Sequence, residues 1–169
     1  MPEHPMEATL QQIEKAIQAE LYYVAIVMAL TLPDICAALE TENAYSGRDE
    51  YKKWYRENLA GKFPAMSDAD CYSLRCGVVH KGNLGLKGSE FSRVVFSLPN
   101  SRRITMHNNI MNDSLQFDAV QFCHEIIASV RAWYNTHAGN ENVQRNLPNI
   151  IQLRPEGLAP YIVGLPIIA

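Results

Sequence analysis

Apolar residues recur at spacings of three and four along the first thirty positions, the repeat of an amphipathic helix. This pattern predicts one long helix over residues 6–30, buried nearly all round in its second half. Pro33 suits the first turn of a helix and Asp34 suits its positive end, so a second helix is expected from Pro33 to about Thr41. The apolar positions of the first helix are Leu10, Ile13, Ile17, Leu21, Val24 and Met28.

Two further helices are expected before the period changes. The first covers residues 48–59. Ser67, with Asp70 three positions later, has the capping-box pattern and begins the other helix, which Gly82 stops near Lys81.

The period then shortens to that of β-strands. Residues 91–98 and 102–107 predict two strands joined by a Pro-Asn-Ser turn, which makes a small β-hairpin at about 90–108. A strong amphipathic helix follows over residues 118–136.

These elements predict a mainly α fold, a bundle of four to five helices with a small β-hairpin insertion, in a single domain over residues 1–137. Residues 138–169 contain four prolines, which forbid a long helix, yet remain rich in Ile, Leu and Val. We expect them to form an apolar C-terminal arm packed on the core or on a partner chain. Such an arm needs a surface to cover, and Gly77 would permit close helix approach, so a homodimer is expected.

Composition and charge exclude several classes of protein. With 169 residues, 47% hydrophobic and 20% charged, and a net charge of −3, the chain is neither disordered nor a coiled coil. Residues 71–112, however, hold six Lys or Arg against one acidic residue, which indicates an anion-binding face unless this is simply a solvated hairpin. The candidate nucleic-acid-binding residues there are Lys87, Arg93, Arg102 and Arg103.

No export signal or membrane span is expected. The first eighteen residues are polar and carry acids, and the most apolar run, Leu21–Leu32, is shorter than the roughly 20 residues that span a bilayer. We therefore expect a cytoplasmic location with the four cysteines reduced.

The densest set of reactive side chains lies on the helix that begins at Ser67. Arg75 and His80 form an Arg-x4-His pattern within LRCGVVHKG, near a helix end and with Gly77 between them. Two other pairs have similar spacing, but one lies on a predicted strand and the helix dipole explains the other. These pairs are Arg102 with His107 and Arg131 with His137.

An Arg and a His suit RNA cleavage without a metal. His80 would take the proton of the attacking 2′-OH, and the guanidinium of Arg75 would meet the charge on the phosphoryl oxygens. On a regular helix, residues five apart point roughly 140° away from each other. The two side chains therefore converge only where the helix ends or distorts near His80, or where two chains share one cleft.

The Arg-x4-His helix in a small helical domain resembles the HEPN superfamily (higher eukaryotes and prokaryotes nucleotide-binding domains). LPDICAALE, YKKWY and DCYSLRCGVVHKG, in that order, resemble an uncharacterised bacterial family. The HEPN resemblance implies a dimeric, metal-independent RNA endonuclease of a toxin or phage-defence type, without a cofactor. Its partners would be RNA and an antitoxin or defence protein.

The resemblance implies Arg75 and His80 as the catalytic pair. Active members commonly carry Asn, Asp or His directly after the Arg, whereas this chain has Cys76. This departure keeps open a second interpretation, a non-catalytic helical binding or structural module with the same fold. The candidate supporting residues are Asp34, Cys76, Tyr72 and Lys81.

Structural roles are open for the same residues. Arg75 would then pair with Asp70, Asp34 or a helix C-terminus, and His80 would cap carbonyls. Asp34 would be a helix-start acid or would orient Arg75.

Two other groups allow more than one interpretation. Cys76 and His80, four residues apart, could bind Zn²⁺ with Cys71 or Cys36, although no metal site is expected in the absence of a Cys-x-x-Cys pair. Three aromatic residues at helical spacing could stack on bases, but such residues usually belong to a core. They are Tyr51, Trp54 and Tyr55.

Overall fold

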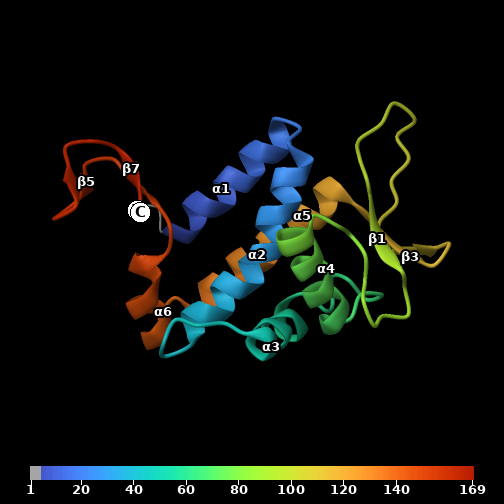
Figure 1. Cartoon of the computed structure of the whole chain (residues 1–169), viewed down its shortest axis with the longest axis horizontal. Helices are drawn as coiled ribbons and strands as arrows, with labels where there is room; N and C mark the ends of the chain where they lie inside the picture. The colour runs from blue at the N-terminus through green and yellow to red at the C-terminus, as the bar shows by residue number, and fades with distance from the viewer. Residues whose placement is uncertain (1–4) are drawn as a thin grey trace.

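The computed structural model describes residues 5–169 as a mainly α protein with six α-helices in that range (Figure 1). The first four residues of the predicted domain 1–137 lie outside the described residues. The helices are α1 (Pro5–Gln18), α2 (Tyr22–Glu40), α3 (Arg48–Asn58), α4 (Asp68–Lys81), α5 (Ala119–His137) and α6 (Glu141–Asn146), with a 3-10 helix at Leu147–Asn149. The strands are β1 (Arg93–Ser97), β2 (Asn109–Met111), β3 (Ser114–Asp118), β4 (Leu153–Arg154), β5 (Gly157–Leu158), β6 (Ile162–Val163) and β7 (Ile167–Ile168).

The prediction of one helix over residues 6–30 is wrong, because the chain reverses at Glu20. Glu20 has a φ of 59°, and the N–H groups of Glu20 and Leu21 donate to the carbonyls of Ile17 and Ala16. These bonds form a Schellman motif, whose left-handed position is usually occupied by Gly. Because Glu20 is not a Gly, the sequence does not mark a helix end there. The apolar pattern therefore continues without interruption across the turn between α1 and α2.

Pro33 lies inside α2, so the prediction of a separate helix starting there is also wrong. Pro33 removes one N–H donor from the helix, and side-chain hydroxyls bond to carbonyls of the preceding turn. Thr31 Oγ1 donates to the Met28 carbonyl at 2.7 Å, and the Tyr51 hydroxyl donates to the Leu30 carbonyl at 3.3 Å. Neither bond reaches the Ala29 carbonyl, which loses its helical donor at Pro33, so the helix continues through the proline because α2 packs against five other helices.

Helix α2 forms the centre of the bundle, where it contacts α1, α3, α4, α5 and α6 (Figure 1). Among the described residues, α2 is the one helix whose length and composition would allow it to cross a membrane, and half of that segment is buried inside the protein. The aromatic residues of α3 belong to this core, since Tyr51, Trp54 and Tyr55 are all buried. Their structural interpretation is confirmed, and they offer no ring face to a base.

The small sheet differs from the predicted hairpin at 90–108. β1 pairs in parallel with β3, β2 pairs antiparallel with β3, and residues 98–108 form a loop rather than a second strand. The hairpin is instead β2–β3, and it turns at Asn112 and Asp113, which both have positive φ. Two adjacent residues with positive φ suit the tight turn of a two-residue hairpin. The strand-like pattern at residues 91–107 favoured a different hairpin, so this turn was not predicted.

The last 32 residues consist of a docked part and a projecting part. Asn142 and Asn146 of α6 donate side-chain hydrogen bonds to carbonyls at the end of α2, and Val143 is buried. Residues 151–169 form two short antiparallel ribbons, β4–β7 and β5–β6, with β5 at the end of the arm far from the helices (Figure 1).

Candidate functional site

Helix α4 places the catalytic candidates, and its limits match the prediction. Ser67 Oγ accepts from the Asp70 N–H at 3.0 Å, and Asp70 Oδ2 accepts from the Ser67 N–H at 3.0 Å. At the other end, Gly82 has a φ of 61° and closes the helix after Lys81. Both helix ends follow from local chemistry that is visible in the sequence.

Arg75 and His80 meet within one chain. The Arg75 Nη1 atom lies 3.1 Å from His80 Nε2, beside the helix end. A guanidinium has only donors, so His80 Nε2 accepts this bond through an unprotonated nitrogen. Convergence thus uses the helix end and the reach of the arginine, and a second chain is not needed to bring the two groups together.

Asp34 holds the other side of the Arg75 guanidinium. Arg75 Nε donates to Asp34 Oδ2 at 2.6 Å, from α4 to α2, and both side chains are about four-fifths buried. Burial raises the pKa of Asp34 above its usual value, although the charge of Arg75 acts in the opposite direction. For Arg75, burial acts to lower the pKa, but Asp34 and Cys76 outweigh this effect and the pKa is raised. Of the pairings open in sequence, the structure has Arg75 with Asp34.

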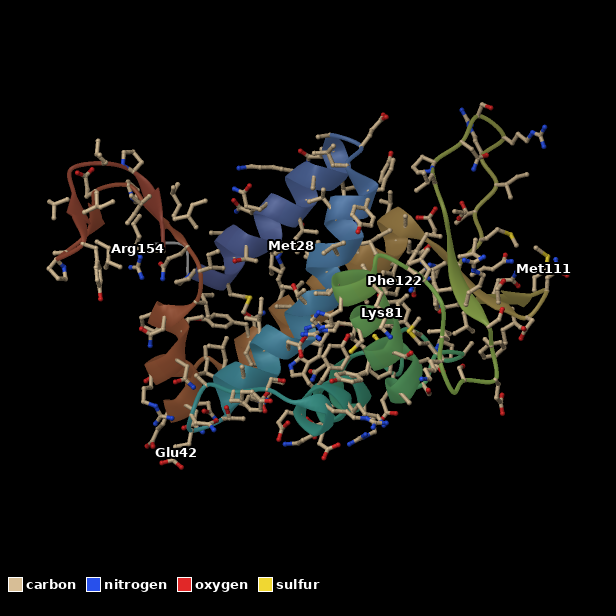
Figure 2. All side chains as sticks on the ribbon, in the orientation of Figure 1. Met28, Glu42, Lys81, Met111, Phe122 and Arg154 are labelled. Carbon is tan, nitrogen blue, oxygen red and sulfur yellow. The ribbon has the colours of Figure 1, made fainter. Side chains whose placement is uncertain are left out.

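Tyr72 and Cys76 lie half-buried beside this pair. Burial raises the pKa of the Tyr72 hydroxyl, and the neighbouring Cys76 adds to this rise. The Cys76 sulfur lies 3.9 Å from Arg75 Nη1. Lys81 is exposed at the end of α4 (Figure 2).

Tyr51 supports the site from α3, a role that sequence analysis did not assign. Its ring packs edge-on against Tyr72 with centroids 5.4 Å apart, and its hydroxyl lies 3.3 Å from the Cys71 sulfur. Burial raises the pKa of Cys71 to about 12, so this thiol stays protonated. A buried Tyr usually needs a hydrogen-bond partner for its O–H. The hydroxyl of Tyr51 was therefore the one sequence feature that could have indicated this role.

Gly77 serves the loop after α4 rather than a helix–helix contact between chains. A Cβ at this position would lie 2.8 Å from the Asn83 carbonyl oxygen, and the Gly77 carbonyl accepts from the N–H groups of Gly82 and Asn83. The loop folds back along α4, where the Lys87 N–H donates to Ser73 Oγ at 3.2 Å. Gly77 therefore gives no structural support for a dimer interface on this helix.

The two other Arg/His pairs have separate structural roles. Arg131 Nε donates to Glu7 at 3.0 Å and Arg131 Nη1 to Glu14 at 2.8 Å, which ties α5 to α1, while His137 stacks on Trp133. The ring of His107 lies among aromatic side chains, whereas Arg102 is exposed. Of the three pairs with this spacing, the structure brings together the one on α4.

The four candidate nucleic-acid-binding residues lie on the segment that runs from the loop after α4 through β1 to the projecting loop (Figure 1). Lys87, Arg93, Arg102 and Arg103 are all exposed, and none forms an ion pair with a carboxylate among residues 5–169. Free cations on an exposed segment are suited to phosphate groups.

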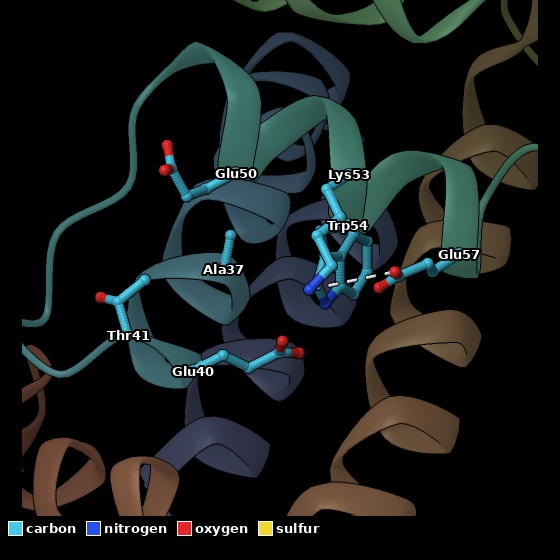
Figure 3. A pocket seen from close by; sticks show the side chains of 7 residues that line it. All are labelled: Ala37, Glu40, Thr41, Glu50, Lys53, Trp54 and Glu57. Atoms are coloured by element: carbon cyan, nitrogen blue, oxygen red, sulfur yellow. Dashed lines mark ion pairs between the residues drawn. The ribbon is translucent and has the colours of Figure 1, made fainter.

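A small hollow between α2 and α3 has the opposite character (Figure 3). Glu40 accepts a hydrogen bond from Trp133 Nε1, and Lys53 lies 4.0 Å from a Glu57 carboxylate oxygen. Three carboxylates against one lysine disfavour a phosphate, so this hollow does not extend an RNA surface. Its volume is about 110 Å³, and its lining residues are Ala37, Glu40, Thr41, Glu50, Lys53, Trp54 and Glu57.

Residues 5–169 contain no group of three or more His, Cys, Asp or Glu side chains that could hold a metal ion. Cys36 and Cys71, the proposed companions of Cys76 and His80, are buried in the core. The zinc interpretation therefore lacks the third ligand it requires in the described part of the chain.

No protein-family model matches this chain, and no curated protein or solved structure is significantly similar to it. The assignment of a function therefore depends on the geometry around Arg75.

Proposed function

We propose that this protein is a HEPN-like, metal-independent RNA endonuclease of a toxin or phage-defence type that acts in the cytoplasm. The observation that carries the proposal is the contact of Arg75 with both Asp34 and His80 at the end of α4. The three groups come from two helices, and a buried carboxylate aims the arginine at an exposed imidazole. An antitoxin or another defence protein would be its regulatory partner.

The proposed reaction uses the 2′-OH of RNA as the nucleophile. His80 Nε2 takes the hydroxyl proton while the 2′-oxygen attacks the adjacent phosphorus. The P–O5′ bond breaks to leave a 2′,3′-cyclic phosphate, and the departing 5′-oxygen takes a proton from water to become a 5′-hydroxyl. Arg75 keeps its Nε bond to Asp34 and turns Nη1 from the imidazole to a phosphoryl oxygen, whose charge it stabilises. The exposed cations from Lys81 to Arg103 would hold the flanking phosphates.

Cleavage of mixed cellular RNA by the purified protein, with and without EDTA, tests this proposal. His80→Ala and Arg75→Ala should each lower the rate by about 10²–10⁴-fold and leave folding nearly intact, whereas His124→Ala, a change at an exposed histidine on α5, should not. EDTA should have no effect, and a substrate with 2′-deoxyribose should stay intact. A folded parent protein that leaves all RNA intact would overturn the proposal.

The second candidate is a non-catalytic binding module. Two observations favour it: Cys76 replaces the polar residue common in active HEPN members, and Arg75 occupies the lone pair of His80 Nε2. In that case the parent protein binds RNA or a protein without cleaving it. Binding of RNA by a parent protein that leaves the RNA intact, and loss of that binding when the four exposed cations are replaced, would favour the module over the enzyme.

A further inference from the structure

The arm formed by residues 151–169 exposes many of its apolar side chains. It carries only two charged residues, Arg154 and Glu156. Tyr161 is 80% exposed and Val163 is 73% exposed, although both are apolar enough for a core. Contiguous apolar surface of this kind marks an interaction site. The exposed apolar residues of the arm are Ile151, Leu153, Tyr161, Ile162, Val163, Leu165 and Ile168.

The same chain carries an apolar groove beside the root of this arm. The groove lies between α1, the start of α2 and the β4–β7 ribbon, and has a volume of about 650 Å³. That volume is within the range of clefts that bind ligands or a few side chains. Lys15 is its one charged lining residue, and Leu21 and Val24 are about half exposed within it.

The arm borders this groove without filling it. Ile151, Leu153 and Ile168 at the root line one side. The tip, residues 157–165, instead leads away from the helices (Figure 1). The chain thus carries a groove with one charged lining residue and, beside it, an apolar tip that lies outside that groove.

We propose that two copies of this chain form a homodimer in which the arm tip of each lies in the α1–α2 groove of the other. We infer that a second copy fills the groove, because one chain supplies both complementary surfaces. With twofold symmetry, each tip is then buried in the groove of the other chain. The apolar, almost uncharged lining of the groove matches the uncharged tip and disfavours a charged partner.

The exposed apolar area of the arm is a large part of what such a dimer needs. At roughly 60–120 Å² per side chain, its seven exposed apolar residues supply about 420–840 Å² of the roughly 800 Å² that each partner contributes to a standard interface. Four of them lie in the tip, and the three at the root line the groove that receives the partner's tip. The open edges of the two-stranded ribbons could add backbone hydrogen bonds across the axis.

Light scattering at micromolar concentration tests the assembly. The parent protein should have a mass of about 38 kDa, twice the 19.0 kDa of the chain. Val163→Glu in the tip and Val24→Glu in the groove should each raise the dimer dissociation constant by at least about 10-fold, since each places a charge in an apolar contact. Ile110→Glu on β2, at a residue 54% exposed and outside both surfaces, should leave the mass unchanged.

A cross-link decides where the tip lies. Val163→Cys on one chain and Val24→Cys on another, both with Cys76→Ser, should form a disulfide-linked heterodimer when mixed and oxidised. A mass of 19.0 kDa for the parent protein overturns the proposal, as does a dimer that both Glu variants preserve. A disulfide that forms only within a chain carrying both cysteines overturns it too, because the tip would then occupy its own groove. Each readout is independent of RNA cleavage, so this proposal and the proposed function can fail separately.

Discussion

At the scale of single residues, two contacts fix the position of the Arg75 guanidinium. Its Nε bonds to Asp34 and its Nη1 to His80, so one guanidinium joins the middle of α2 to the end of α4. Burial raises the pKa of Asp34 despite the neighbouring cation. The folded state therefore holds the Asp34 proton more tightly than the unfolded state, and ionisation of this carboxyl costs stability as the pH rises above about 4. A buried carboxylate retained against such a cost is typical of a functional position.

Asp34→Asn should therefore separate activity from stability. We expect its free energy of unfolding at pH 7 to equal or exceed that of the parent protein, rather than fall by the ~3–5 kcal/mol typical of breaking a stabilising buried pair. RNA cleavage should fall at least about 10-fold, because Arg75 loses the group that aims it.

Urea unfolding and cleavage rates, measured on the same samples, check this expectation. Asp34→Glu, which keeps a carboxylate, should recover part of the rate. A strong loss of stability in Asp34→Asn would contradict the positioning role and make the pair a structural one.

At the scale of elements, the ends of two helices set the geometry. Helix α4 is followed by a Gly in the left-handed region, whereas the left-handed position after α1 is Glu20, a residue for which that region costs free energy. The turn at Glu20 nevertheless forms, because α1 must fold back on α2 to bury its apolar face. Local preference and tertiary packing disagree at this position, and packing prevails.

Glu20→Gly should stabilise the protein by about 0.5–1 kcal/mol, because Gly adopts a φ of 59° without steric cost. The midpoint of urea unfolding measures the effect. Ala19→Gly, one residue earlier and outside the left-handed region, is the matched control and should be neutral or destabilising. An equal response to both substitutions would show that the left-handed position at Glu20 carries no strain.

At the scale of the whole molecule, an aromatic cluster joins the sheet to the helices. The rings of Phe63, Phe117 and Phe122 pack on one another, and His107 lies 5.6 Å from the Phe117 ring. Both ring nitrogens of His107 are buried without a well-formed hydrogen bond to the described residues. Burial lowers the pKa of His107 below 6.5, which Asp118 and Glu125 only partly offset.

This histidine should make the protein sensitive to acid. Because the folded state binds the His107 proton more weakly than the unfolded state, its contribution to stability is complete above about pH 6.5 and is lost as the pH falls through the lowered pKa. His107→Phe should reduce the decline in the free energy of unfolding between pH 7 and pH 5, as measured by urea titration at each pH. The exposed His124→Gln is the control and should retain the slope of the parent protein. An unchanged slope in His107→Phe would contradict this assignment.

Features that depend on neighbours along the chain could be predicted from the sequence alone. The capping box and final Gly of α4, the helical period of α5 and the basic run after α4 are all local signals, and they located the Arg75–His80 helix. The other features depend on the tertiary structure. It turned the chain at Glu20, carried α2 through Pro33 at the centre of the bundle, and paired β1 with β3 across the intervening loop. It also brought Asp34 to Arg75 across 41 positions, because the contact depends on how α2 packs on α4. A periodic pattern shows which face of a helix or strand is apolar. Which other element packs against that face depends on how the whole core assembles.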